Sequence, residues 1–329
     1  MRPRYVYGPV PSRRFGLSLG VDLVPRKVCC FDCTYCQVGP TTELTVQRQL
    51  FVDPDVVVRD VEAALRDRRA EVVTLSGSGE PTLYAALDEL ARGLRRITEL
   101  PLALLTNGAL LGDDDVLEAA RRFDIVAPSL DAGDAETFER VNRPAAGLTF
   151  ARVLDGLRRF CERFDGTCRL EVMLLEGEND SPRSLDAIAR IAGSLRVSTV
   201  DLNTVVRPPA HAARGLSAEA MQRALACFGH CHASVIAAYR PRDTGPGSDE
   251  DARQHVRLLA PFGRSAVEAQ ILATVARRPC TLDDLTAALG LPREQVLALC
   301  TAALAAGELL ERRSEGATYY AIAHVSGGD

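Results

Sequence analysis

Residues 29–36 read CCFDCTYC, and the rest of the chain is best interpreted outward from this stretch. Four of the ten cysteines of the protein lie within these eight residues. Taken as C-x3-C-x2-C, the spacing places three thiols, those of Cys29, Cys33 and Cys36, on one short loop. Thiolates are soft ligands that suit zinc and iron–sulfur clusters. Three such ligands leave one coordination position open, where a second molecule can bind and react.

Composition predicts a soluble cytoplasmic protein with more than one domain. The chain has 329 residues, which is long for a single core. Its net charge of −5 gives no general attraction to nucleic acid or to a membrane surface. We find neither an apolar run of the roughly 18 residues that span a membrane nor a signal peptide. In a reducing compartment, closely spaced cysteines indicate metal binding or catalysis rather than disulfides.

After a constrained loop at residues 1–18, strand patterns alternate with helix patterns along the chain. The strands are predicted at 17–24, 72–75, 102–105, 125–128, 169–175, 199–206 and about 233–239. The helices between them are predicted at about 54–65, 83–97, 113–122, 134–141, 149–164, 182–195 and 217–228. This order predicts an α/β fold, a partial or complete TIM-like (β/α) barrel of parallel strands. The cysteine loop follows the first strand, so it belongs to the carboxyl edge that carries active sites in such folds.

The sequence changes character after residue 240. Residues 241–263 are polar and broken by glycine and proline, which predicts a linker between a barrel domain at 1–240 and a small domain at 264–329. The small domain reads as three helices followed by a β-hairpin, the order of a winged helix. Its six arginines and eight acidic residues give a net charge of −2, which argues against DNA binding. We expect it to recognise a substrate or partner, with RNA as the second choice.

The cysteine spacing, with Tyr35 just before the last thiol, resembles the radical S-adenosylmethionine (SAM) superfamily. The segment at 77–81, Gly-Ser-Gly-Glu-Pro, resembles the glycine-rich GGEP segment of that family, with one serine in place of a glycine. The resemblance covers residues 17–205, and the opening segment at 8–14 is more distantly similar to the radical SAM enzyme of wybutosine synthesis on tRNA. The resemblance to the radical SAM superfamily implies a [4Fe–4S] cluster held by Cys29, Cys33 and Cys36. It also implies SAM contacts by Tyr35, Gly77, Ser78, Gly79, Glu80, Thr106, Asn107, Ser129 and Asp131.

The same resemblance implies a reaction. A reduced cluster passes one electron to SAM, which splits into methionine and a 5′-deoxyadenosyl radical that takes hydrogen from a substrate. An external flavodoxin or ferredoxin supplies the electron. The favoured substrates are RNA (tRNA in particular) and peptides or proteins, with a small molecule also open. Substrate contacts are predicted at Arg13, Arg14, Asn203 and Arg207.

Several alternatives stand beside this interpretation. Cys29, Cys33 and Cys36 can also be read as a structural zinc site, with Cys30 as a further thiol. Thr106, Asn107, Ser129 and Asp131 belong to types that also cap helices after strands, and Arg13 and Arg14 can equally belong to a solvated loop. Cys227 and Cys231 are candidates for a second metal site. The rival function is a metal-binding winged-helix transcriptional regulator.

Overall fold

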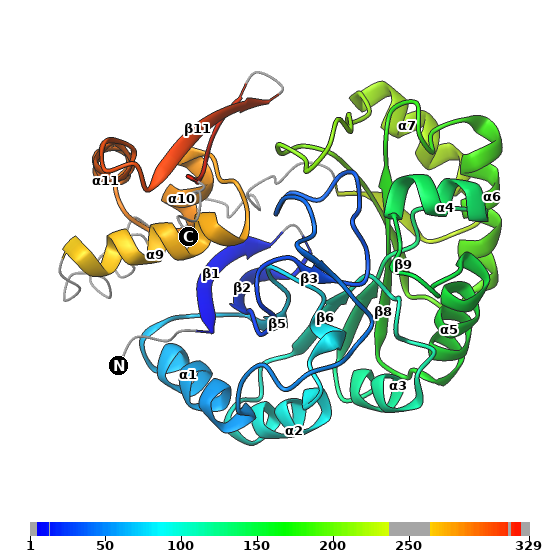
Figure 1. The fold of residues 1–329 in the computed structure, drawn as a ribbon, viewed down its shortest axis with the longest axis horizontal. Coiled ribbons are helices and arrows are strands. Elements are labelled where there is room, and N and C mark those ends of the chain that lie inside the picture. Colours follow the sequence, from blue (N-terminus) through cyan, green and yellow to red (C-terminus); the bar gives the residue numbers. More distant parts are fainter. Residues whose placement is uncertain (1–4, 13, 237–263, 315–316, 324–329) are drawn as a thin grey trace.

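A computed structural model describes residues 5–12, 14–236, 264–314 and 317–323 (Figure 1). The predicted linker at 241–263 and the side chain of Arg13 lie outside these residues. Within the described part, no helix combines the length and the apolar character needed to cross a membrane. The chain forms a central sheet, helices that cover it and a separate C-terminal unit (Figure 1).

One eight-stranded sheet forms the centre of the molecule, in the order β1-β2-β5-β6-β7-β8-β9-β10. All neighbours are parallel except β1, which runs antiparallel to β2. This linear order, with β1 at one edge and β10 at the other, is that of a partial barrel, and the predicted α/β class is confirmed. The strands are β1 (Val6–Ser12), β2 (Gly16–Val21), β5 (Val72–Leu75), β6 (Leu102–Thr106), β7 (Ile125–Pro128), β8 (Thr167–Leu174), β9 (Thr199–Thr204) and β10 (Ala233–Val235).

Helices cover the outer face of the curved sheet (Figure 1). Several begin at a side chain that accepts a hydrogen bond from the first-turn backbone, as Asp53, Asp134, Thr149, Ser181 and Ser217 do. Their apolar faces and the strands bury one continuous core. The helices are α1 (Pro54–Asp67), α2 (Leu87–Ile97), α3 (Asp114–Ala120), α4 (Ala135–Asn142), α5 (Phe150–Arg163), α6 (Pro182–Ser194) and α7 (Ala218–Cys227), with the short 3₁₀ helix η1 (Pro81–Leu83) before α2.

Strand β1 corrects the sequence interpretation, which took this segment for a loop. Its prolines, Pro9 and Pro11, suggested a loop, but proline is compatible with an edge strand because no second neighbour needs its missing N–H. The pairing with β2 is irregular between Tyr7 and Val10. The consequence is that the N-terminal segment forms the edge of the sheet, where it meets the C-terminal unit.

The C-terminal residues build a second unit with a core of its own. It consists of α9 (Arg264–Arg277), α10 (Leu282–Leu289), α11 (Arg293–Ala305) and the hairpin of β11 (Leu309–Ser314) and β12 (Ala317–Ile322). Its buried side chains include Ile271, Leu285, Val296, Leu299 and Leu309. Three helices and a hairpin follow the predicted order, while the winged-helix assignment and the domain boundaries stay predictions. Helices α9 and α10 pack against β1 (Figure 1).

Candidate functional site

The cysteine loop leaves the sheet after β2 and is held in place by its backbone. A short strand, β3 (Val28–Cys29), pairs in parallel with β4 (Glu43–Leu44). Further along, the Asp32 N–H donates to the carbonyl oxygen of Asn142 at the end of α4, with an N–O distance of 3.1 Å. The ring of Phe31 is buried, so the loop is anchored on both sides. These contacts fix the path of the chain that carries the thiols.

Each of the three predicted ligand thiols accepts a hydrogen bond from a nitrogen donor. Hydrogen bonds to sulfur are one of the means by which proteins hold and tune iron–sulfur clusters. The three donors come from different parts of the chain. They are Lys27 Nζ to Cys36 Sγ at 3.1 Å, Asn107 Nδ2 to Cys29 Sγ at 3.6 Å and Asn142 Nδ2 to Cys33 Sγ at 3.7 Å.

Cys30 differs from these three cysteines because its side chain is fully buried in the hydrophobic core. Burial raises the pKa of the Cys29 thiol to about 11 and that of Cys33 well above its usual range. Such thiols ionise when a bound metal stabilises the thiolate. Among the described residues, no three His, Cys, Asp or Glu side chains converge closely enough for a single ion. A cluster whose cysteines bind different irons accepts wider spacing, so the thiols fit a cluster better than one zinc ion.

The glycine-rich segment lies directly against the cysteine loop. The Lys27 N–H donates to the Ser78 carbonyl at 2.7 Å, and the Glu80 N–H donates to the Val28 carbonyl at 3.1 Å. A Cβ atom at Gly79 would lie 2.3 Å from the Val28 oxygen, so this close approach requires glycine. The two segments singled out by the sequence therefore form one backbone-linked unit.

Asp22 connects this unit to the C-terminal helices. Its carboxylate accepts hydrogen bonds from the Ser78 N–H at 3.0 Å and from the Ser78 hydroxyl at 2.6 Å. Gly77 has a φ of +155°, and a Cβ there would lie 2.2 Å from the Asp22 carboxylate. The same carboxylate lies 3.0 Å from Nε of Arg277, at the end of α9. Sequence reasoning missed Asp22, which carries no recognisable pattern of its own.

Glu80 is buried and its carboxylate is saturated by the chain. Oε1 accepts from the Thr82 N–H at 3.1 Å, the Thr82 hydroxyl at 2.7 Å and the Thr106 hydroxyl at 2.6 Å, while Oε2 accepts from the Asn107 N–H at 2.8 Å. Burial raises the pKa of Glu80, and these hydrogen bonds act in the opposite direction. Glu80 thus joins the ends of β5 and β6 in this structure, and its predicted contact with the amino group of SAM stays a prediction.

The side chain of Tyr35, from the cysteine loop, contacts Asp131. The Tyr35 hydroxyl donates to Asp131 at 2.5 Å, the Asn142 amide donates at 2.8 Å and the Met173 N–H at 2.9 Å. Burial raises the pKa of Asp131 to about 6 even though these hydrogen bonds lower it. Asn142 therefore contacts both Asp131 and Cys33. Sequence reasoning missed Asn142, and the one usable signal for it was its place as a polar residue at the end of a predicted helix.

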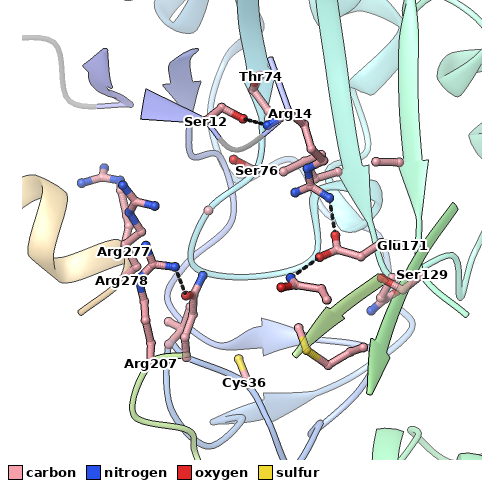
Figure 2. A pocket seen from close by; sticks show the side chains of 18 of the residues that line it. Ser12, Arg14, Cys36, Thr74, Ser76, Ser129, Glu171, Arg207, Arg277 and Arg278 are labelled. Atoms are coloured by element: carbon pink, nitrogen blue, oxygen red, sulfur yellow. Dashed lines mark hydrogen bonds and ion pairs between the residues drawn. The ribbon is translucent and has the colours of Figure 1, made fainter. Parts of the chain in front are cut away.

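A cavity of about 360 Å³ opens at this edge of the sheet, within the size range of small-molecule sites (Figure 2). It brings together most of the predicted SAM contacts, one cluster thiol and three of the predicted substrate contacts. Cys29, Cys33 and Ser78 are not among the residues that line it. The predicted residues that line it are Tyr35, Cys36, Gly77, Gly79, Glu80, Thr106, Asn107, Ser129, Asp131, Arg14, Asn203 and Arg207.

The cavity is also lined by residues that the sequence did not indicate, namely Glu171, Arg277 and Arg278. Glu171 on β8 pairs with Arg14 at 2.5 Å and accepts a hydrogen bond from the Asn203 amide at 2.8 Å. Arg277 and Arg278 reach the cavity from the C-terminal unit (Figure 2). The side chains of this cavity come from distant parts of the sequence, and they become neighbours only in the folded chain.

The proposed second metal site gains no support. Cys227 is exposed, and its thiol contacts the Arg223 carbonyl. Cys231 and His230 both contact the Ala189 carbonyl instead of a shared centre, at 3.9 and 3.1 Å. Within the part of the chain that the structure describes, no set of three ligating side chains surrounds them. A metal role for Cys227 and Cys231 stays an unsupported prediction.

A partial parallel barrel, with three thiols and a glycine-rich segment at its carboxyl edge, defines a class of cluster-dependent enzymes. The family profile described as "Radical SAM superfamily" matches residues 23–187, half of the chain. The protein therefore belongs to the radical SAM superfamily, whose members are enzymes that use a [4Fe–4S] cluster and SAM. This membership gives no support to the alternative of a transcriptional regulator.

Individual relatives agree with this placement. A UPF0026 protein of Helicobacter pylori is 36% identical over 219 residues, which cover 65% of this chain and 70% of that protein. A solved radical SAM methyltransferase from Sphaerobacter thermophilus, 19% identical, shares the fold with a TM-score of 0.50 over 66% of each chain. A Brachyspira hyodysenteriae protein called "GTPase Obg" is 30% identical over 98% of this chain. This chain spans only 46% of the length of that protein. The lone lysine here, Lys27, follows arginine, so the glycine–lysine pair of a phosphate-binding P-loop is absent.

Proposed function

We propose that this protein cleaves SAM reductively at a [4Fe–4S] cluster bound by Cys29, Cys33 and Cys36, and uses the resulting radical to take hydrogen from a substrate in the cavity. When bound, the cluster and SAM supply the radical chemistry, and the chain supplies ligation, orientation and exclusion of water. The observation that carries the proposal is the set of three hydrogen-bonded thiols beside a glycine-lined cavity. Cys36 lines the cavity, so a cluster held by the three thiols would supply its chemistry next to this space.

The residues around the cavity have distinct roles in this proposal. Gly77 and Gly79 let the glycine-rich segment pack closely against Asp22 and Val28, because a side chain at either position would collide with the chain itself, and we assign this segment to SAM binding. Glu80 links the glycine-rich segment to the end of β6 through its hydrogen bonds from Thr106 and Asn107. Asp131 fixes the hydroxyl of Tyr35, which we assign to the neighbourhood of adenine. Ser129, Thr106 and Asn107 are assigned to the ribose and carboxylate of SAM.

Lys27 deserves a separate assignment because it is a buried ammonium beside a thiol. Its side chain is 4% exposed, and Nζ lies 3.1 Å from the Cys36 sulfur. Burial opposes the charged form, yet the neighbouring thiols Cys36 and Cys29 raise the pKa of Lys27 overall. A cation at this position stabilises the thiolates that hold an anionic cluster. We therefore assign Lys27 to cluster binding.

For the substrate we propose RNA or a peptide or protein. Either polymer can insert one small group into a cavity of about 360 Å³ while the remainder stays outside. Arg14, Glu171 and Asn203 form the wall that meets this group. For the electron donor we propose an external flavodoxin or ferredoxin.

The test is product formation under anaerobic conditions. The full chain is reconstituted with iron and sulfide, reduced with dithionite and supplied with SAM. Liquid chromatography with mass spectrometry should detect 5′-deoxyadenosine and methionine in equal amounts. A colourless protein that retains zinc and leaves SAM intact would refute the proposal.

A further inference from the structure

A cluster of arginines forms the outer wall of the cavity, and two of them come from the C-terminal unit. Arg207 follows β9, whereas Arg277 ends α9 and Arg278 comes directly after it. All three line the cavity, and Figure 2 shows their side chains gathered on one side of it, opposite Glu171. The C-terminal unit therefore contributes directly to the space where a substrate would meet SAM.

The acids near these arginines do not neutralise them fully. Asp22 pairs with Arg277 at 3.0 Å. Asp284 lies 3.7 Å from Arg207, a long ion pair, and its carboxylate already accepts a hydrogen bond from the Thr281 N–H in the cap of α10. Three arginines thus face two carboxylates, one of which is committed to a helix cap.

Arg278 and Arg207 have unused hydrogen-bonding capacity. Among the described residues, no carboxylate lies within ion-pair distance of Arg278, and its buried Nε atom has no hydrogen-bond partner. The Arg207 side chain is only 9% exposed. Within the described part of the chain its Nε also lacks a partner, and its side chain makes a long hydrogen bond to Gln37 at 3.4 Å. Buried guanidinium groups are costly to leave unpaired.

The charge of Arg278 acts on Arg207, whereas the pKa of Arg278 itself, although burial lowers it, is raised overall by Cys280 and Asp284. Burial, followed by the nearby charge of Arg278, lowers the pKa of Arg207. Arg277 is held over the Tyr7 ring, with its Cζ atom 4.9 Å from the ring centroid, and the Tyr7 hydroxyl is hydrogen-bonded to Ser76. Mutual repulsion of fixed cations is relieved when an anion binds between them.

We propose that Arg207 and Arg278, supported by Arg277, bind a phosphate group of the substrate, so that the C-terminal unit completes the active site. A carboxylate is matched by the fork of one guanidinium group, whereas the oxygens of a phosphate can accept from two forks at once. Hydroxyl-bearing residues line other parts of the same cavity, namely Ser12, Ser18, Thr74 and Ser76. This inference rests on the proposed function, because it assigns the substrate of the same cavity.

Binding of inorganic phosphate to the full chain tests this inference. Calorimetric titrations are run with SAM present, so that the subsite for the SAM carboxylate is already filled. Wild-type protein should bind phosphate, and Arg278→Gln and Arg207→Gln should each weaken binding about tenfold or more, the loss expected for a charge-assisted hydrogen bond. Arg278→Lys should recover part of the affinity because it retains the charge.

Arg313→Gln is the matched control, since Arg313 is exposed on β11. It should bind phosphate as the wild type does, and circular dichroism should show that every variant is folded. The inference is overturned if wild-type protein does not bind phosphate, if both cavity variants bind it normally, or if acetate binds equally well. A nucleoside monophosphate and a short single-stranded RNA are then compared as competitors, which distinguishes a free metabolite from RNA.

The same preparation separates failure of this inference from failure of the proposed function. If wild-type protein forms 5′-deoxyadenosine but does not bind phosphate, the phosphate site is wrong and the radical SAM function stands. If it binds phosphate through Arg207 and Arg278 but assembles no cluster and cleaves no SAM, the proposed function is wrong and the anion site remains without its substrate role.

Discussion

At the scale of single residues, the cysteine loop contains three predicted ligand thiols and a fourth cysteine, Cys30, that is not a predicted ligand. Cys33 accepts a hydrogen bond from the buried Asn142 amide, whereas Cys30, three residues earlier, lies fully buried in the apolar core. The four cysteines are close in sequence, yet their side chains have different surroundings. This difference permits a matched pair of substitutions.

Cys33→Ala should remove the cluster, and Cys30→Ala should retain it. Iron and sulfide analysis after anaerobic reconstitution should give about four irons per chain for Cys30→Ala and close to none for Cys33→Ala, because a cluster held by two thiolates is poorly bound. Equal iron content in the two variants would show that the ligands have been assigned wrongly.

Asp131 should make stability depend on pH in an unusual direction. Burial raises its pKa from the ordinary 3.8 to about 6 in the folded chain. Between these values the folded state binds more protons than the unfolded state, so the free energy of unfolding falls as pH rises from about 4 to about 6. The contribution is about 2 kcal/mol. It should be absent in Asp131→Asn.

The measurement is denaturant unfolding of wild type and variant, without cluster, at several pH values. The difference in unfolding free energy between the two proteins isolates Asp131 from the other titrating groups. Asp186→Asn on the exposed face of α6 is the control and should follow the wild type. If Asp131→Asn keeps the same slope as the wild type over this pH range, the assignment is wrong.

At the scale of elements, the glycine-rich segment and the cysteine loop fit together through close backbone contacts. Gly77 combines a φ of +155° with a position where a Cβ atom would lie only 2.2 Å from the Asp22 carboxylate, whereas Gly177 has a φ of +75° and open space around it. Both positions strain an L-residue, but only one of them also produces a collision. This pair separates the cost of backbone strain from that of steric overlap.

Gly77→Ala should therefore destabilise the chain more than Gly177→Ala, by about 1–3 kcal/mol. Asp22 would have to move, and its hydrogen bonds to Ser78 would be lost or stretched. Denaturant unfolding measures the difference, and equilibrium dialysis with SAM measures the effect on the site. Equal stabilities would mean that Asp22 adapts without cost and does not position the segment.

The elements also show where reasoning from sequence succeeds. Strand–helix alternation predicted the sheet and its helices because each element shows the hydrophobic periodicity of its type and has its own capping residues. The segment at 125–128 was predicted with the bounds that β7 has. The same local rules failed at β1, because Pro9 and Pro11 are loop signals unless the strand lies at an edge, and edge position is a property of the whole sheet.

At the scale of the whole molecule, the C-terminal unit is joined to the glycine-rich segment through Asp22. The Asp22 side chain is 8% exposed and that of Arg277 15%, and Asp22 also binds Ser78. A double-mutant cycle on Asp22 and Arg277 should give a coupling free energy of about 1–3 kcal/mol. The exposed pair Asp88–Arg92 on α2 should give about 0.5 kcal/mol or less.

Unfolding curves of the single and double alanine variants provide both coupling energies. Equal coupling in the two pairs would show that the contact between the C-terminal unit and the barrel contributes no more than a surface ion pair. A larger value for Asp22–Arg277 supports a C-terminal unit that is fixed at the mouth of the cavity, as the arginine cluster requires.

The site itself was only partly predictable from sequence. Cys29, Cys33, Cys36 and the glycines could be proposed from the sequence because their spacing on short segments is itself the signal. Asn142, Glu171 and Arg278 could not be proposed, because each makes its contacts with residues distant in the chain. Arg278 follows an amphipathic helix and resembles any solvated arginine until the fold places it beside Arg207.

The central claim is that three cysteine thiolates hold a cluster whose remaining iron binds SAM beside the cavity. Electron paramagnetic resonance of the reduced, reconstituted chain tests it most directly, with spectra recorded before and after addition of SAM. The account predicts a [4Fe–4S] signal that changes when SAM is added and that is missing in Cys33→Ala. A signal that SAM leaves unchanged, or no cluster signal in the wild type, would contradict it.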